Sequence, residues 1–283
     1  MEVTSLLTGK RGVCLPFTDY CEPLISQSGQ FKGLFDFAID FGERHGWKYL
    51  EIRGAETFLE NEEPSELYLG HTLDLADGEK KIFSKFRDST KRNIKKAEKE
   101  NVKVEIANTV NAINEFYRLN SLTRRDHGLP PQPYHFFKNI YNEIISKHAG
   151  FISFATLNNT AIAGNVYLLF GEKVIYKYGA SDRNYQHFRA SNLVMWEAIK
   201  WCCKNGYKNM CFGRTETDND GLKQFKSGWG TKEHVIKYYK YDFRKSSFVK
   251  DCAKISNFQH KFFNKLPIPL LNAFGTLLYK HMG

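Results

Sequence analysis

The chain of 283 residues is long enough for one large or two ordinary domains, and its 42% hydrophobic and 15% aromatic content excludes a disordered chain. The net charge of +10 favours anionic partners: nucleic acid, phosphate-bearing substrates or the anionic face of a membrane. The six cysteines form no CxxC pair and no metal-ligand spacing, so we expect reduced thiols, no metal and a cytoplasmic location.

Residues 33–54, GLFDFAIDFGERHGWKYLEIRG, predict a helix that leads into a strand. Apolar residues recur at helical spacing as far as Gly46, a left-handed cap, and then alternate as in a strand. Ahead of them, RGVCLPFTDY at 11–20 predicts a central strand whose other neighbour is missing.

The same helix-to-strand pattern occurs a second time, in NLVMWEAIKWCCKNGYKNMCFGR at 192–214. Its helix stops at Gly206, and an aromatic residue, a lysine and alternating apolar residues follow, as they do after Gly46. Only about 32 residues precede the first helix, against roughly 85 in the second unit, so the duplication predicts a first lobe that is incomplete at its N-terminal side.

A basic segment, KIFSKFRDSTKRNIKKAEKENVKVEIA, joins the two units. Phe83, Phe86 and Ile94 give it one apolar edge, so we expect a helix over 83–101 that closes near Asn101 and leads into a strand. Its lysines and arginines have two interpretations. They are either a solvated face with local ion pairs or a surface for tRNA phosphates.

Residues 102–245 predict an α+β unit with a central mixed sheet. Two helices are split by HGLPPQPY at 127–134, and three strands follow over 150–181 with tight turns at Asn158–Asn159 and Gly171–Glu172. A helix and a strand complete the unit. The order of elements resembles the acetyltransferase fold known as GNAT.

The duplicated lobe, the basic helix with KRNIKKAEKENVKVE and the closing GLKQFKSGWG together resemble the Fem peptidyltransferases and their shorter FemAB-like relatives. The resemblance covers about residues 5–245. It implies tandem GNAT-like lobes, the first partial (1–82), the basic linking helix (83–101), the second lobe (102–245) and a C-terminal helical segment (246–283).

The family resemblance implies an acyltransferase that forms an amide on an amine of a cell-envelope or exopolysaccharide precursor, which can be lipid-linked or nucleotide-linked. The donor would be aminoacyl-tRNA or acyl-CoA, with no permanently bound cofactor. A non-catalytic anion- or RNA-binding module with a degenerate site is the alternative.

Lys226, at the end of a short helix closed by Gly228, matches the lysine that the Fem enzymes use to stabilise an oxyanion. Alternatively, it is a solvated lysine at a helix C-terminus. Phe225 would anchor this helix. The residues that precede this helix have two expected roles, substrate contact and helix capping. We expect Asp218 and Asp220 to cap the helix. The substrate candidates there are Arg214, Glu216, Asn219 and Phe225, with Tyr178 on an earlier strand.

The loop YGASDRNYQHFRASN at 178–192 occupies the position of the GNAT phosphate loop, but Ala190 and Ser191 stand where glycines are usual. The phosphate candidates are Arg183, His187, Arg189 and Ser191, and the alternative is a basic surface loop. In TRRDHGLPPQPY, Arg124 and Arg125 are acceptor candidates, and His127 is either a general base or an exposed loop histidine.

In the first lobe, CEPLIS at 21–26 falls where Fem enzymes have a Gly-Pro pair and an acidic acceptor contact. Ser26 replaces that acid, which makes Asp19 and Tyr20 the alternatives. At the other end, FFNKLPIPLLNAFGTLLYKHMG is apolar on one face, and its prolines exclude a spanning helix. It is expected either to pack on the core or to dock on the inner face of a membrane.

Overall fold

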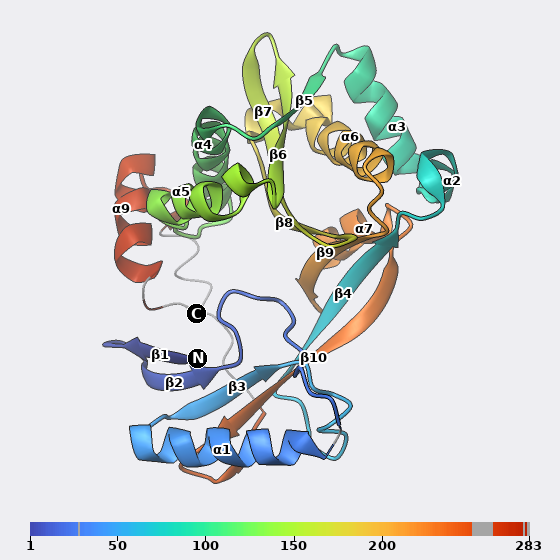
Figure 1. Ribbon diagram of the computed structural model, residues 1–283. Coiled ribbons are helices and arrows are strands. Elements are labelled where there is room, and N and C mark those ends of the chain that lie inside the picture. The colour runs from blue at the N-terminus through green and yellow to red at the C-terminus, as the bar shows by residue number, and fades with distance from the viewer. Residues whose placement is uncertain (28, 251–262, 280, 282–283) are drawn as a thin grey trace.

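The computed structural model describes residues 1–27, 29–250, 263–279 and 281 (Figure 1). Its strands are β1 (Glu2–Ser5), β2 (Gly9–Val13), β3 (Tyr49–Arg53), β4 (Glu66–Asp74), β5 (Lys103–Ala107), β6 (Gly150–Leu157), β7 (Thr160–Phe170), β8 (Lys173–Ser181), β9 (Asn209–Glu216), β10 (Lys232–Asp242) and β11 (Ser247–Phe248). Its α-helices are α1 (Gln30–His45), α2 (Gly78–Lys85), α3 (Asp88–Lys99), α4 (Val110–Asp126), α5 (Tyr134–Glu143), α6 (Ala190–Lys204), α7 (Asp220–Ser227) and α9 (Ile268–Tyr279), and two short 3-10 helices are η1 (Ile145–Lys147) and η2 (Arg183–Phe188).

The strands form one sheet in the order β1-β2-β3-β10-β4-β9-β8-β7-β6-β5, with β11 paired to β10. The long strands β4 and β10 run from a lower, first lobe into an upper, second lobe (Figure 1). Backbone hydrogen bonds therefore run without interruption from the first lobe to the second through one sheet.

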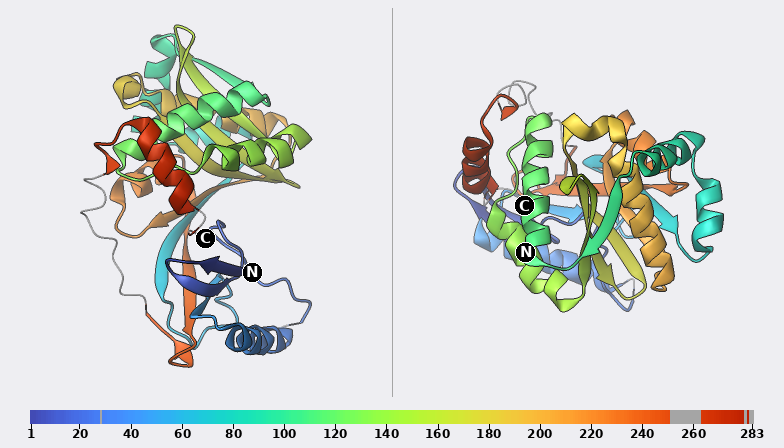
Figure 2. Two further views of the ribbon diagram at one scale, coloured as in Figure 1. Left: turned by 90° about the vertical axis from the view of Figure 1, so that its left-hand side faces the viewer. Right: turned by 90° about the horizontal axis from the view of Figure 1, so that it is seen from above.

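In the second lobe the sheet is covered on both faces (Figure 2). One core lies between the sheet and α6, with α2 and α3 outside, and includes Tyr167, Trp196 and Trp229. The other lies under α4 and α5 and includes Phe116 and Phe137. Burial on both faces explains why β6 is apolar almost without alternation.

The predicted duplication is confirmed by the topology. In the first lobe β2, α1 and the parallel strand β3 form a crossover unit, and in the second lobe β8, α6 and the parallel strand β9 form the same unit. Gly46 and Gly206 both follow their helices with positive φ, at 68° and 82°. The turn at Asn158–Asn159 is also left-handed, as its hairpin position requires.

The structure differs from the sequence-based expectation in three places. The basic segment breaks at Phe86, where the chain is extended, into α2 and α3, and α3 packs on α6 inside the second lobe rather than linking the lobes. Strand β10, expected in the second lobe, pairs with β3 and β4 of the first. Strand β2 ends at Val13 and has β1 on its other side, so its neighbour is not missing.

The C-terminal segment expected at 246–283 contains β11 and α9, and residues 251–262 lie outside the described part of the chain. Helix α9 packs beside α4, with Leu271 buried and Gly275 against the Pro131 carbonyl. Beyond it, His281 Nδ1 lies 3.1 Å from Ser5 Oγ of the first lobe. Across the described residues, we find no helix with the length and apolarity needed to cross a membrane.

Candidate active site

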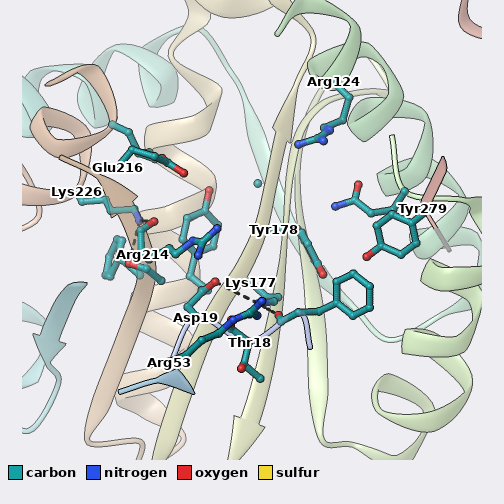
Figure 3. A pocket seen from close by; sticks show the side chains of 17 residues that line it. Thr18, Asp19, Arg53, Arg124, Lys177, Tyr178, Arg214, Glu216, Lys226 and Tyr279 are labelled. Carbon is teal, nitrogen blue, oxygen red and sulfur yellow. Dashed lines mark hydrogen bonds and ion pairs between the residues drawn. The ribbon is translucent and has the colours of Figure 1, made fainter. Parts of the chain in front are cut away.

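A cleft opens in the second lobe where two parallel strands separate. Strands β8 and β9 pair only over Lys173–Ile175 and Asn209–Cys211, and beyond these residues they diverge. A cavity of about 590 Å³ fills the opening, and the side chains that line it come from both lobes (Figure 3). The edges of β8 and β9 that face the cleft no longer pair with each other.

A bulge shapes the β9 wall. Gly70 pairs with Arg214 and Thr72 with Cys211, so two residues of β9 oppose the single residue His71 of β4. Gly213 has φ of +69°, which a residue with a side chain adopts only with strain. His71 is fully buried, and burial followed by the nearby Lys226 charge lowers its pKa, which keeps it neutral.

Lys226 is held against this bulge by α7. Its Nζ donates hydrogen bonds to the carbonyl oxygens of Gly213 (3.0 Å) and Arg214 (2.8 Å), and the residue is only 3% exposed. Burial lowers the pKa of Lys226 to about 8, although the Asp19 carboxylate opposes the shift. An ammonium has three donors, so one N–H remains for a ligand in the cleft.

Helix α7 is fixed at both ends. Asn219 caps its N-terminus, because its Oδ1 accepts a hydrogen bond from the Leu222 amide at 3.1 Å. Phe225 packs edge-on against Trp229, with ring centroids 6.0 Å apart, and belongs to the core. The cap is therefore Asn219 and not the expected Asp218 or Asp220. Phe225 positions the helix and does not line the cleft.

The first lobe contributes a loop that reaches across to the bulge. Arg53 Nη1 donates to the Thr18 carbonyl at 2.8 Å, and the Tyr238 hydroxyl donates to the Asp19 carbonyl at 2.8 Å. The Asp19 carboxylate lies so close to Gly213 that a Cβ there would be 2.8 Å from Oδ2. Lys177 Nζ is 3.7 Å from the same carboxylate.

Arg214 follows the bulge and stands over aromatic rings. Its guanidinium carbon lies 4.2 Å from the centroid of the Tyr68 ring and 5.2 Å from that of Tyr238. These contacts hold the cation at the cleft wall, near Glu216 at the end of β9 (Figure 3).

Arg124 and two tyrosines form the opposite end of the cleft (Figure 3). Arg124 donates from Nε and Nη2 to the Pro130 carbonyl, both at 3.2 Å. Burial raises the pKa of both Tyr178 and Tyr279, so their hydroxyls stay protonated. Tyr279, from α9, stacks on Phe17 with centroids 5.0 Å apart. This end can therefore donate several hydrogen bonds to an anion.

Six of the predicted residues meet in this cleft: Lys226, Arg214, Glu216, Tyr178, Arg124 and Asp19. Of the others, Tyr20 packs its ring on Gly54, and burial raises its pKa to about 12. Arg125 and His127 sit at the end of α4 outside the cleft, and His127 lines a second cavity of about 250 Å³ together with Arg183.

The predicted phosphate loop is folded into the 3-10 helix η2. Tyr185 and Phe188 turn inward and pack on the core, and Arg189 adopts a left-handed conformation just before α6. None of Arg183, His187, Arg189 and Ser191 lines the main cleft. The alternative that they form a basic surface loop fits this arrangement.

Sequence reasoning missed several residues that line the cleft. Lys177 neighbours the predicted Tyr178, and a lysine in the middle of the apolar and aromatic residues of β8 could have drawn attention to it. Arg53, Thr18, Gln132 and Tyr279 carry no such signal, because they come from the other lobe, a proline-rich loop and the C-terminal helix.

Comparisons with known proteins agree with this fold. Residues 84–227, just over half of the chain, match the family described as acetyltransferase (GNAT) domain. A lipid II:glycine glycyltransferase of Staphylococcus haemolyticus is 29% identical over 100 residues, which are 33% of this chain and 22% of that protein. The protein of the same name from Staphylococcus epidermidis is 33% identical over 76 residues, 25% of this chain and 18% of its own length. The matched segments thus span about a fifth of these relatives.

Solved structures share the arrangement over more of the chain. The crystal structure of FemX superimposes with a TM-score of 0.60 and 14% identity, over 77% of each chain. A tandem GNAT protein from the clavulanic acid biosynthesis pathway gives a TM-score of 0.52 with 8% identity, over 77% of this chain and 71% of that one. The chain therefore belongs to the acetyltransferase (GNAT) domain family, and it is similar in part of its sequence to the two staphylococcal glycyltransferases and in its fold to FemX.

Proposed function

We propose that this protein is an N-acyltransferase that joins an activated acyl or aminoacyl group to an amine of a cell-envelope precursor. The observation that carries the proposal is the buried Lys226 ammonium, held by the two carbonyls of the β9 bulge with one N–H left for the cleft. A fixed donor of this kind favours an amide-forming reaction, because the tetrahedral intermediate of that reaction carries an oxyanion.

The reaction balances with groups that line the cleft. The amine nitrogen attacks the acyl carbonyl carbon, and the C–N bond forms. The carbonyl oxygen becomes an anion that accepts a hydrogen bond from the Lys226 N–H. Asp19 takes the proton that the nitrogen loses, since its carboxylate faces the bulge. The intermediate then collapses, and the bond to the thiol or ribose oxygen breaks. That leaving group takes a proton from water, and the Asp19 carboxyl returns its proton to the solvent, which restores the carboxylate.

The acceptor would be anchored at the opposite end of the cleft. Arg124 and the hydroxyls of Tyr178 and Tyr279 suit a phosphate or carboxylate. The staphylococcal relatives are named as acting on lipid II, and we extend this to a lipid-linked, phosphate-bearing acceptor here. The acceptor would then place its reacting amine at the Lys226 end of the cleft and its anionic group at the Arg124 end.

We further propose aminoacyl-tRNA as the donor. The basic helix α3 adjoins the helix that carries Lys226: Arg87 Nη2 donates to Ser227 Oγ at 3.0 Å, and Thr90 packs against Gly228. Phosphates bound along α3 would bring the aminoacyl end of the tRNA toward α7. The inward packing of Tyr185 and Phe188 in η2 removes the open glycine loop that a coenzyme A diphosphate uses in related folds.

The test compares charged tRNA and acetyl-CoA as donors with an amine acceptor, for the wild type and Lys226→Ala. We expect transfer from charged tRNA, with binding that weakens steeply with salt, and a loss of about 10²- to 10³-fold in the rate for the variant. Transfer from acetyl-CoA alone would contradict the donor assignment. Equal transfer rates for both proteins would contradict the role given to Lys226, and no transfer by the wild type from either donor would contradict the enzyme assignment and favour an anion-binding module.

A further inference from the structure

The outer face of α9 carries no charged side chain. From Leu266 to Tyr279 the sequence contains no Asp, Glu, Lys or Arg. Leu270, Phe274 and Leu277, which are three and four residues apart, lie on one side of the helix, and Leu270 and Leu277 are 53% and 58% exposed. A helix face in contact with water alone is normally polar, so this face is unusual.

Helix α1 provides the contrast within the same molecule. It also exposes two large apolar residues, Leu34 at 51% and Phe37 at 62%. On α1, however, ion pairs at i, i+4 lie among them, Lys32 with Asp36 and Arg44 with Asp40. Exposed apolar residues alone therefore do not distinguish α9, whereas the absence of charge over its three turns does.

The turn between β1 and β2 adds to the same side of the molecule. Leu6 in this turn is 94% exposed, and its neighbour Leu7 is also exposed. The turn adjoins the end of α9, because Ser5 Oγ lies 3.1 Å from His281 Nδ1. Both α9 and this hairpin lie on the left-hand side in Figure 1 and face the viewer in the left view of Figure 2.

We propose that the outer face of α9, together with the β1–β2 turn, docks on an anionic lipid surface. The helix of 12 residues is roughly 18 Å long, too short to cross a hydrocarbon core of about 30 Å, but suited to lying at its boundary. The exposed Lys265 precedes the helix by three residues, and the chain carries a net charge of +10. That charge attracts anionic headgroups and opposes pairing with a second copy of the chain.

The inner face of the same helix reaches the cleft. Tyr279 lines the Arg124 end of the cavity, and Gly275 brings α9 into direct contact with the Pro131 carbonyl. The docked surface and the acceptor end are thus separated by about one helix diameter, roughly 10 Å. This inference rests on the proposed function, since it explains how a lipid-linked acceptor enters the cleft without leaving the membrane.

The experiment is co-sedimentation of the full chain with vesicles of phosphatidylcholine alone or with phosphatidylglycerol added. The variant is Leu270→Ser/Leu277→Ser, and the matched control is Leu34→Ser/Phe37→Ser on α1, which removes equally exposed residues. We expect wild type and control to bind anionic vesicles, and the α9 variant to bind about tenfold less tightly or worse.

Transfer to a water-soluble amine should be unchanged in the α9 variant, while transfer to a vesicle-embedded acceptor falls. Equal vesicle binding by variant and wild type, or no binding by the wild type, overturns the proposal. A dimer that the α9 substitutions dissociate would also overturn it, because the face would then be a contact between copies. Vesicle binding requires neither donor nor acceptor, so its failure is distinguishable from failure of the proposed reaction.

Discussion

Lys226 combines two properties that seldom occur together, nearly complete burial and a positive charge. The carbonyls of Gly213 and Arg214 compensate part of the desolvation, and the bulge that exposes them depends on the positive φ of Gly213. Because burial remains the largest influence, the pKa of Lys226 falls to about 8 and lies within the range of ordinary assays. The charge of this group is therefore open to a pH test.

Transfer should decline as the pH rises through about 8. Below this value Lys226 is protonated and can stabilise the oxyanion, and above it the ammonium loses its proton and its charge. Hydroxylamine is the acceptor to use, because it remains uncharged over this range and does not add its own titration. The measurement is the pH profile of transfer to hydroxylamine.

Lys226→Arg is the matched variant, since a guanidinium stays charged throughout this range. It should retain part of the activity and show no decline near pH 8. A decline at the same pH in both proteins would assign the titration to another group. Lys226→Met serves as a folding control. It removes a costly buried charge at similar length, so its thermal unfolding should stay close to that of the wild type.

Helix α9 is the element that completes the cleft from the end of the chain. Its docking depends on Gly275, where a Cβ would come within 2.1 Å of the Pro131 carbonyl oxygen. The backbones approach each other so closely because neither has a side chain between them. Tyr279, one turn further, then reaches the cleft and stacks on Phe17.

Gly275→Ala should loosen this wall. The added methyl group forces α9 away from Pro131, at a cost of about 1–3 kcal/mol that exceeds the gain in helix propensity of about 1 kcal/mol. We expect a lower unfolding temperature and a higher KM for the anionic acceptor, with less change in kcat. Thr276→Ala, on the exposed side of the same turn, is the control and should leave KM unchanged. An unaltered KM in Gly275→Ala would show that α9 is not part of the acceptor end.

At the scale of the whole molecule, neither lobe contains the site alone. The second lobe supplies Lys226, Arg214 and Arg124, whereas the first supplies Asp19 through a loop that Arg53 holds. The sheet also crosses between the lobes, because β10 leaves the second lobe to pair with β3 and β4. The segment that matches the GNAT family is therefore embedded in a larger cooperative unit.

This continuity predicts that residues 84–227 expressed alone will not form a stable, active domain. The fragment lacks β4, so the edge of β9 that carries the bulge would be unpaired and exposed. We expect aggregation or a broad, non-cooperative thermal transition, measured by circular dichroism against the full chain. A sharp transition together with retained transfer activity would contradict the shared-sheet account.

The helix-to-strand repeat was predictable because it depends on local signals: helical spacing, a glycine cap and an alternating strand after each of Gly46 and Gly206. The break at Phe86 was harder to predict, since the polar residues on both sides suit one long helix. Packing of Phe86 against Trp196 and Trp229 decides where the first helix ends. The strands that pair with β10 could not be predicted, because strand pairing joins residues far apart in the sequence and no local pattern encodes it.

The candidate site divides in the same way. Arg214, Glu216 and Lys226 lie within one short segment, and the resemblance of GLKQFKSGWG to the Fem enzymes is what made Lys226 a candidate at the sequence level. Asp19 was only one of two possibilities, and Arg53 and Tyr279 were invisible, because these residues meet the others only after the lobes and α9 have packed. The sequence by itself determined which helices and strands form and which lysine is a candidate. Only the tertiary structure decided which residues share a cleft, because distances between distant segments are set by packing, whereas local sequence controls only neighbouring residues.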